Sequence, residues 1–160
     1  HALPQVRHAL IAALRETPEA GRPWLRDPAD GVRPILGRGL EIVKALTVAT
    51  LATGFGSLAR QNGYNTNSGF AGFSGFVVGS DYEAELARAM RSPGACHLVM
   101  CHPGHGDAEA AALDPVIARR DEELKALMQM PDLPSKIAHV RRPADGPIAS
   151  WRALAEGGHG

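Results

Sequence analysis

A short apolar run that ends abruptly at a histidine, a proline and a glycine constrains the fold of this chain more than any other feature. The run Cys96 to Cys101 contains Leu98-Val99-Met100 and is followed by His102-Pro103-Gly104. A short apolar run bounded by turn residues is typical of a buried strand. We therefore expect Cys96 to Cys101 to form a strand and His102 to lie at its carboxyl edge, where the active sites of α/β proteins gather. A single histidine before a turn is also often structural, so the pattern alone leaves both roles open.

Helical and extended patterns alternate along the rest of the chain. Helices are expected at 4–16, across 35–62 with a break near Gly54, after a capping box at 80–83, from Asp114-Pro115 onward and at 148–154. Strands are expected at 24–26, 66–73, 96–101 and 136–140. This alternation predicts an α/β fold of mostly parallel strands alternating with helices, without an internal domain boundary.

The spacing of apolar residues also defines the buried faces expected for the two later helices at 80–90 and from Asp114 onward. In the helix that follows the capping box at Ser80, this face consists of Tyr82, Leu86 and Met90. Asp121 and Lys125, four residues apart in the helix from Asp114, predict an ion pair. The apolar face of that helix is expected to contain Leu113, Val116, Ile117, Leu124, Leu127 and Met128.

Charge and hydropathy argue against several classes of partner. The 17 basic and 17 acidic side chains cancel without forming a basic block, so we expect no nucleic-acid partner. The longest apolar stretch, Ala45 to Leu51, is far shorter than the roughly 20 residues of a membrane span. No charged leader precedes an apolar segment, so no signal peptide is expected. Cys96 and Cys101 are too far apart in one strand for a disulfide, which favours the reducing cytoplasm.

Further polar side chains are expected at the same edge of the sheet. Arg26 ends the 24–26 strand, so its guanidinium would reach sugar hydroxyls or a carbonyl oxygen, unless it pairs with Asp27 or Asp30. Asn67 lies in a glycine-containing segment and would either offer its amide to a ligand or form a turn. The residue types alone do not decide between these roles.

The segment after the apolar strand is too poor in ligands for a metal site of its own. Cys101, His102 and His105 offer three donors, and Cys101 and His102 point to opposite faces of a strand, so they do not readily share one ion. We expect no metal to be bound by this segment. His105 and Asp107 are expected at the rim, where they shape the substrate entrance or cap the next helix.

Three segments together resemble one known family. Leu98 to Asp107, Asn67 to Phe73 and Arg120 to Leu124 are similar to the C-terminal half of the YdjC-like carbohydrate deacetylases, closest to the branch associated with hopanoid biosynthesis. The first residues, from His1, resemble the end of the family's Asp-x-His-x-His-x-His segment, with a tag remnant as the alternative origin of His1. The resemblance extends from His1 to about Leu127.

This resemblance implies a reaction. Family members are (β/α) barrel-like, metal-dependent hydrolases that remove the acetyl group from an N-acetylated sugar, in the hopanoid branch an N-acetylglucosaminyl-type head group on a hopanoid lipid. A divalent ion, Mg²⁺ or Zn²⁺, would be held by an aspartate and two histidines that we do not place on this sequence, and His1 would only adjoin that motif. His102 would be the catalytic proton donor to the departing amine. The side chains expected to contact the substrate are Arg26, Asn67, His105 and Asp107.

The resemblance also makes the chain part of a larger domain. Residues 1–160 are expected to be a single partial domain, the C-terminal half of a barrel, inactive without the half that carries the metal ligands. Unpaired strand edges in such a half predict a homodimer. Two other functions remain open, a non-catalytic α/β binding or scaffold module and a barrel hydrolase acting on another bond such as a phosphoester.

Overall fold

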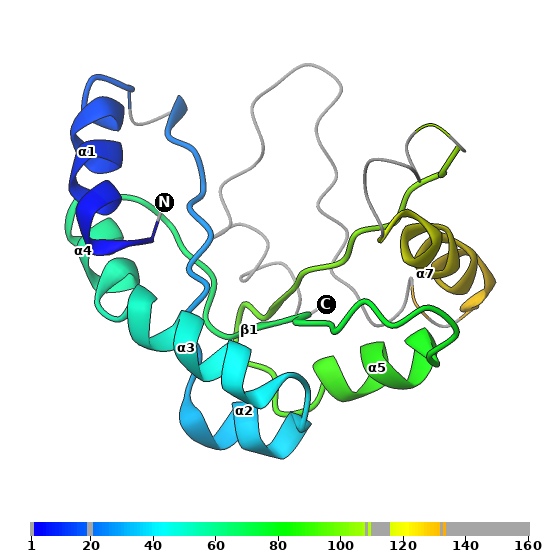
Figure 1. Cartoon of the computed structure of the whole chain (residues 1–160). Coiled ribbons are helices and arrows are strands. Elements are labelled where there is room, and N and C mark those ends of the chain that lie inside the picture. The colour runs from blue at the N-terminus through cyan, green and yellow to red at the C-terminus, as the bar shows by residue number, and fades with distance from the viewer. Residues whose placement is uncertain (1, 19–20, 108, 110–115, 132, 134–160) are drawn as a thin grey trace.

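The computed structural model describes residues 2–18, 21–107, 109, 116–131 and 133. Its strands are β1 (Phe70–Ala71) and β2 (Leu98–Val99). Its helices are α1 (Pro4–Leu14), α2 (Val32–Arg38), α3 (Ile42–Ala52), α4 (Phe55–Gln61), α5 (Tyr82–Ala89) and α7 (Ile117–Gln129). Figure 1 shows the helices following an arc, with the extended segments on its inner side. The described part of the chain is therefore a mixed helix and sheet structure, compatible with the expected α/β class.

The strands β1 and β2 pair in parallel, as the alternation of helices and strands predicts. The pairing continues one residue further, because the amide of Met100 donates to the carbonyl oxygen of Ala71 at 2.9 Å. A third extended segment joins through an isolated parallel bridge between Leu25 and Thr66. Two strands and one such bridge support a parallel α/β arrangement but do not show a barrel.

Two glycines limit the length of β1. Gly69 and Gly72 flank the strand, and both have a φ of +99°, a conformation that residues with a side chain rarely adopt. Gly72 also lies against the backbone that follows β2, since a Cβ there would come within 2.0 Å of the carbonyl oxygen of Met100. The backbone therefore turns out of the ladder on both sides of β1, and the strand expected over 66–73 is reduced to two residues.

The neighbouring strands are also shorter than expected. The strand predicted at 24–26 is reduced to the bridge at Leu25, because the backbone of Asp27 bonds to the side chain of Asn67 instead of to a strand. The strand predicted at 96–101 is reduced to β2, because Cys96 pairs with Ser68 in an isolated antiparallel bridge. The strand expected at 136–140 and the helix expected at 148–154 lie outside the described residues.

The expected helical region 35–62 contains two breaks. The break near Gly54 is confirmed, and Gly54 has a φ of +82°. The second break, between α2 and α3, was not predicted; there Gly39 and Glu41 have φ values of +65° and +40°. By length and composition Ile42–Gln61 resembles a membrane span, but Gly54 divides it into helices of 11 and 7 residues. Each of these two helices is shorter than the roughly 20 residues of a membrane span, so the composition of this segment does not establish one.

A buried apolar cluster joins the N-terminal helices to the extended segment at Leu25. Phe55 and Ala59 of α4 are fully buried in it. Tyr64 closes the cluster, and its hydroxyl donates to the carbonyl oxygen of Leu14 at 2.6 Å. The remaining buried members are Ala2, Ile11 and Ala52. This core fixes α1, α3 and α4 as one unit beside the sheet.

The cap of α5 differs from the expected one. The carboxylate of Asp81 accepts the amide of Ala84 at 3.0 Å and is therefore the N-cap. Ser80, expected in that role, instead donates its hydroxyl to Glu85 at 2.6 Å. The predicted start of the helix is confirmed, but the predicted capping residue is wrong. The buried residues of α5 are Tyr82, Leu86 and Ala89, with Met90 as the C-cap.

The most buried side chains of α7 are charged, whereas Val116, Ile117, Leu124 and Leu127 of the expected apolar face are half-buried. Arg119 is 0% exposed and Glu123 1%, whereas Met128, expected to be buried, is 80% exposed. The prediction for Met128 is wrong because the buried side of α7 faces carboxylate and carbonyl oxygens that neutralise a guanidinium. Asp121 and Lys125 form the expected ion pair at 2.6 Å. The expected helix start, Leu113, Asp114 and Pro115, lies outside the described residues.

Candidate active site

His102 lies three residues beyond the end of β2, at the carboxyl end of the parallel pair. Its backbone amide donates a hydrogen bond to Oε2 of Glu123 at 2.7 Å. Its ring meets the ring of Phe76 edge to face, with centroids 5.1 Å apart and 65° between the planes. The residue is half-buried. The protein thus holds both the backbone and the ring of His102 while leaving part of the residue open to solvent.

Phe76 brings a strained piece of backbone against His102. Its φ is +53°, in the left-handed region, which is unusual for a bulky residue. Its amide donates to Oγ of Ser74 at 3.0 Å, which holds the turn in place. Lys44 adds a cation 5.4 Å from the centroid of the Phe76 ring and donates to the carbonyl oxygen of Ser74 at 3.1 Å. Strained backbone of this kind clusters at functional sites.

The buried Arg119 ties α7 to α5 and to the chain just before it. Its Nη2 lies 2.8 Å from Oε1 of Glu85, and its Nη1 donates to the carbonyl oxygen of Ser80 at 2.8 Å. Nη1 also lies 3.3 Å from Oε2 of Glu122, and Nε lies 4.0 Å from Oε1 of Glu123. One guanidinium is therefore surrounded by three carboxylates, which is how a fully buried cation is tolerated.

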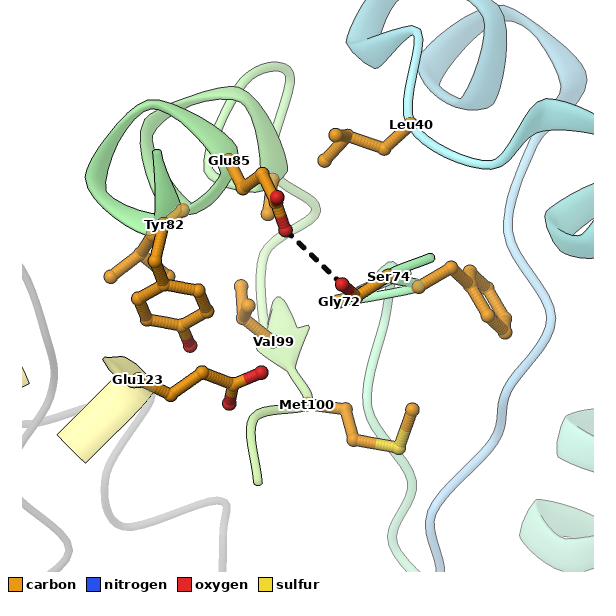
Figure 2. Close-up of a pocket in the computed structure, with 11 residues that line it drawn as sticks. Leu40, Gly72, Ser74, Tyr82, Glu85, Val99, Met100 and Glu123 are labelled. Atoms are coloured by element: carbon orange, nitrogen blue, oxygen red, sulfur yellow. Dashed lines mark hydrogen bonds between the residues drawn. The ribbon is translucent and has the colours of Figure 1, made fainter. Parts of the chain in front are cut away.

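A small cavity lies between α5, α7 and the sheet (Figure 2). Figure 2 shows the carboxylates of Glu85 and Glu123 directed toward it from different helices, with the hydroxyl of Ser74 bonded to Glu85 at 3.2 Å. The cavity volume is about 20 Å³, close to the space of a single water molecule. It is too small for a sugar, so these carboxylates do not line a substrate pocket here.

Tyr82 and Cys101 form a further polar contact beside Glu123. The hydroxyl of Tyr82 donates to the sulfur of Cys101. Burial, together with the negative charges of Cys101 and Glu123, raises the pKa of Tyr82 above its usual range. Burial and the charge of Glu123 also raise the pKa of the Cys101 thiol. Both groups are neutral at neutral pH, so Cys101 is not an activated nucleophile. Neither cysteine forms a disulfide, as expected.

Arg26 borders a larger cavity of about 240 Å³ on the other side of Met100. Its Nη1 lies 3.6 Å from the sulfur of Met100, and its guanidinium carbon lies 5.9 Å from the centroid of the Phe70 ring. Asp30, considered above as a partner for Arg26, pairs with Arg38. The walls of this cavity are mostly apolar and include Leu3, Val48, Leu51, Phe70 and Phe73. Met100, two residues before His102, forms part of its wall.

Asn67 joins two pieces of backbone. It is 3% exposed, its Oδ1 accepts the amide of Asp27 at 2.7 Å, and its Nδ2 donates to the carbonyl oxygens of Asp27 and Gly69 at 2.7 and 2.9 Å. These bonds correspond to the structural role left open by the sequence.

The side chain of Asp27, whose backbone Asn67 holds, is itself partly buried. Burial raises the pKa of the Asp27 carboxyl above its ordinary value, and hydrogen bonds from Ala29 and Gly56 oppose that rise.

The remaining expected site residues lie at the surface or outside the described part of the chain. The side chain of His105 is 90% exposed, with Nδ1 3.9 Å from Oδ1 of Asp121. Asp107 is exposed as well. His1 lies outside the described residues. His105 and Asp107 are thus exposed a few residues after His102 in the chain, and their place at a rim and their contact with substrate stay predictions.

No group of three histidine, cysteine, aspartate or glutamate side chains that could hold a metal ion occurs among the described residues. The candidates weighed in the sequence do not converge either, since the thiol of Cys101 turns to Tyr82 and His105 turns to Asp121. The residues described therefore do not fit a divalent ion by themselves.

Comparison with known protein families tests the family resemblance that the sequence segments around His102, Asn67 and Glu123 suggest. The chain matches the profile of the family described as YdjC-like protein over residues 1–137, which is most of its length. The chain belongs to the YdjC-like family. Members of this family are related in general to carbohydrate deacetylases and typically depend on a metal ion. No curated protein and no solved structure matches the YdjC-like chain.

Two residues of this YdjC-like site were missed by the sequence analysis. Arg119 and Glu123 are four residues apart on α7, a spacing that usually marks an exposed ion pair. Their burial depends on Glu85 and Ser80, which are far from α7 in the sequence. One signal was available. The segment Arg120 to Leu124, which resembles the family, contains Glu123 and has four charged residues in a row that an apolar helix face does not require.

Proposed function

We propose that this YdjC-like chain supplies the proton donor of a carbohydrate N-deacetylase, and that the donor is His102. The observation that carries the proposal is the position of His102 at the carboxyl end of β2, half-buried and held at both its backbone and its ring. The carboxyl ends of parallel strands are where α/β proteins place their reacting groups. Membership of a family related to carbohydrate deacetylases supports the same reaction.

In the proposed reaction, water attacks the acetyl carbon and the carbon–nitrogen bond of the amide breaks. The released nitrogen needs a proton, and the imidazole of His102 would supply it, leaving acetate and a free sugar amine. Histidine is the side chain that most often transfers a proton in enzyme reactions. Contact with Phe76 restricts the orientations of the ring, which supports transfer in one direction.

The cavity beside Arg26 supports a substrate with both polar and apolar parts. Its guanidinium would donate to sugar hydroxyls or to the acetyl carbonyl, and the apolar walls would take the less polar portion of the molecule. Met100 borders this cavity, and His102 follows it by two residues. An N-acetylglucosaminyl-type head group on a hopanoid lipid is the substrate that we propose, with His105 and Asp107 at the rim.

A divalent ion, Mg²⁺ or Zn²⁺, is the cofactor that we propose for the whole protein. Because the described residues do not fit an ion, its ligands would come from elsewhere. We therefore derive no step of the reaction through the ion. Residues 1–160 alone should then hold no tightly bound divalent ion. Elemental analysis after dialysis that found about one equivalent would contradict this expectation. A cytoplasmic location remains part of the proposal.

The experiment measures acetate release from N-acetylated sugars and glycolipids by the full-length protein and by its His102→Ala variant. Loss of a general acid should lower turnover by about 100-fold or more. His8→Ala is the control, because His8 is an exposed histidine on α1 that has no role in the proposed site; its turnover should stay within about threefold of wild type, since removal of an exposed side chain disturbs little else. Full activity of His102→Ala would reject the assignment. Cleavage of phosphoesters, or no turnover of any substrate, would favour the other barrel hydrolase or the binding module.

A further inference from the structure

The contact between His102 and Glu123 gives α7 a role at the proposed site. The Oε2 atom of Glu123 accepts the backbone amide of His102 at 2.7 Å, and Glu123 is 1% exposed. We propose that Glu123 is a positioning residue, whose buried carboxylate fixes the His102 backbone and thereby the direction of its imidazole. This inference rests on the proposed function, because it gives His102 the task of donating a proton.

A second bond from the same helix holds the other side of the turn. The amide of Gly104 donates to the backbone carbonyl oxygen of Arg120 at 3.2 Å. The segment His102-Pro103-Gly104 is therefore bonded to α7 at both ends, and the ring of Pro103 restricts the backbone between them. Helix α7, rather than the sheet, fixes the turn that carries the imidazole.

The carboxylate of Glu123 is an unusual choice for a purely structural acceptor. A buried charge is costly unless it is paired, and the compensating cation, Arg119, must be buried as well. A carboxylate accepts a shorter and stronger hydrogen bond from a backbone amide than a neutral group does. This strong hydrogen bond holds the backbone of His102 rigidly. The orientation of the imidazole matters for the reaction, because small misplacements of reacting groups lower rates steeply.

Other contacts of α7 hold the helix without reaching His102, which provides a matched control. Glu122 accepts the amide of Gly79 at 3.0 Å with each of its carboxylate oxygens and also pairs with Arg119. It is next to Glu123 in the sequence and joins the same guanidinium. A substitution at Glu122 therefore tests the attachment of α7, whereas one at Glu123 tests the attachment of His102.

The first measurement does not depend on activity. In the full-length protein, nuclear Overhauser contacts between the rings of His102 and Phe76 report the orientation of the imidazole, since the centroids lie 5.1 Å apart. We expect these contacts to be lost in Glu123→Leu, which keeps most of the volume but removes the acceptor. They should be retained in Glu123→Gln, which keeps an acceptor, and in Glu122→Gln. Retention in a folded Glu123→Leu variant would overturn the inference, whatever the activity. If Glu123→Leu does not fold, Glu123→Asp takes its place, because the shorter side chain keeps the charge but draws the acceptor away.

The second measurement is a double-mutant cycle on acetate release from N,N′-diacetylchitobiose and from an N-acetylglucosaminyl lipid. Glu123→Leu should lower kcat by about tenfold or more with KM within about twofold, and Glu123→Gln should recover most of that loss. In the His102→Ala background, Glu123→Leu should have no further effect, because the residue acts through His102. Additive losses would overturn the inference. Unchanged activity of His102→Ala would instead reject the proposed function, while the ring contacts would still decide the role of Glu123.

Discussion

Nη2 of Arg119 lies 2.8 Å from Oε1 of Glu85, so a single buried ion pair joins α7 to α5. Both ends are held by further contacts, since Glu85 accepts the hydroxyls of Ser74 and Ser80. The guanidinium also lies 5.2 Å from the centroid of the Tyr82 ring. The helix that anchors His102 is therefore attached to α5 through a fully buried guanidinium and a carboxylate that is 20% exposed.

Arg119→Leu should destabilise the protein strongly. Removing the cation leaves Glu85 and the buried Glu123 without their partner, and breaking a buried pair in this way costs about 3–5 kcal/mol. Because Glu85 is 20% exposed, we expect the lower end, about 3 kcal/mol. The measurement is the free energy of unfolding in urea. Lys125→Leu is the control, because Lys125 forms an exposed pair with Asp121, and its unfolding midpoint should be close to that of wild type. Equal midpoints for both variants would contradict the expected role of Arg119.

Gly72→Ala should disrupt the pairing of β1 with β2. A Cβ at Gly72 would come within 2.0 Å of the carbonyl oxygen of Met100, and the φ of +99° disfavours any side chain. Gly79→Ala is a matched control, because Gly79 has a φ of +80° but no atom near its missing Cβ. The control should lose about 1 kcal/mol from the strained φ alone, and Gly72→Ala should lose about 2 kcal/mol more from the clash. Similar unfolding free energies for the two variants would show that the backbone moves to accommodate the extra carbon.

Particular residues show how much of this structure the sequence could reveal. The parallel pairing of β1 and β2 followed from the alternation of helical and extended patterns, and the break at Gly54 followed from its glycine. The lengths of the strands did not, because they depend on positive φ values at Gly69 and Gly72 that no local pattern encodes. The position of His102 at the end of a strand was predictable, since it depends on sequence neighbours. Its anchor, Glu123, was not, because that contact joins residues 21 positions apart and requires a buried charge.

The stability of the protein should fall at mildly acidic pH because of His97. Burial lowers the pKa of His97, and the charge of Arg38 acts in the same direction, against the hydrogen bond to the carbonyl oxygen of Ala89. The unfolded chain, with a histidine pKa of about 6.5, then binds the proton more readily than the folded one. The contribution of His97 is therefore fully present above this value and is lost as the pH falls through the lower folded pKa.

Urea unfolding at about pH 7.5 and about pH 5.5, on either side of the unfolded pKa, measures this effect. His97→Gln should show a smaller fall in unfolding free energy between the two conditions than wild type. His105→Gln should fall as wild type does, because the side chain of His105 is 90% exposed. An identical fall in His97→Gln and wild type would assign the pH dependence to other groups.

Residues 1–160 on their own should associate into a dimer or a larger species. Several apolar side chains on α2 and α3 are open to solvent, with Val32 59%, Leu36 53% and Val43 80% exposed. The helices follow the outside of the arc in Figure 1, and the short parallel sheet offers strand edges that other chains can pair with. Because these three side chains are apolar, association through them should persist at high salt, where screening weakens charged contacts. Light scattering at micromolar concentration measures the mass of the associated species.

A pair of variants tests which surface mediates this association. Val43→Lys should shift the population toward monomer, while Met128→Lys, equally exposed on α7, should not. A monodisperse wild-type monomer would mean that this part of the chain needs no partner, against the expectation of an incomplete barrel.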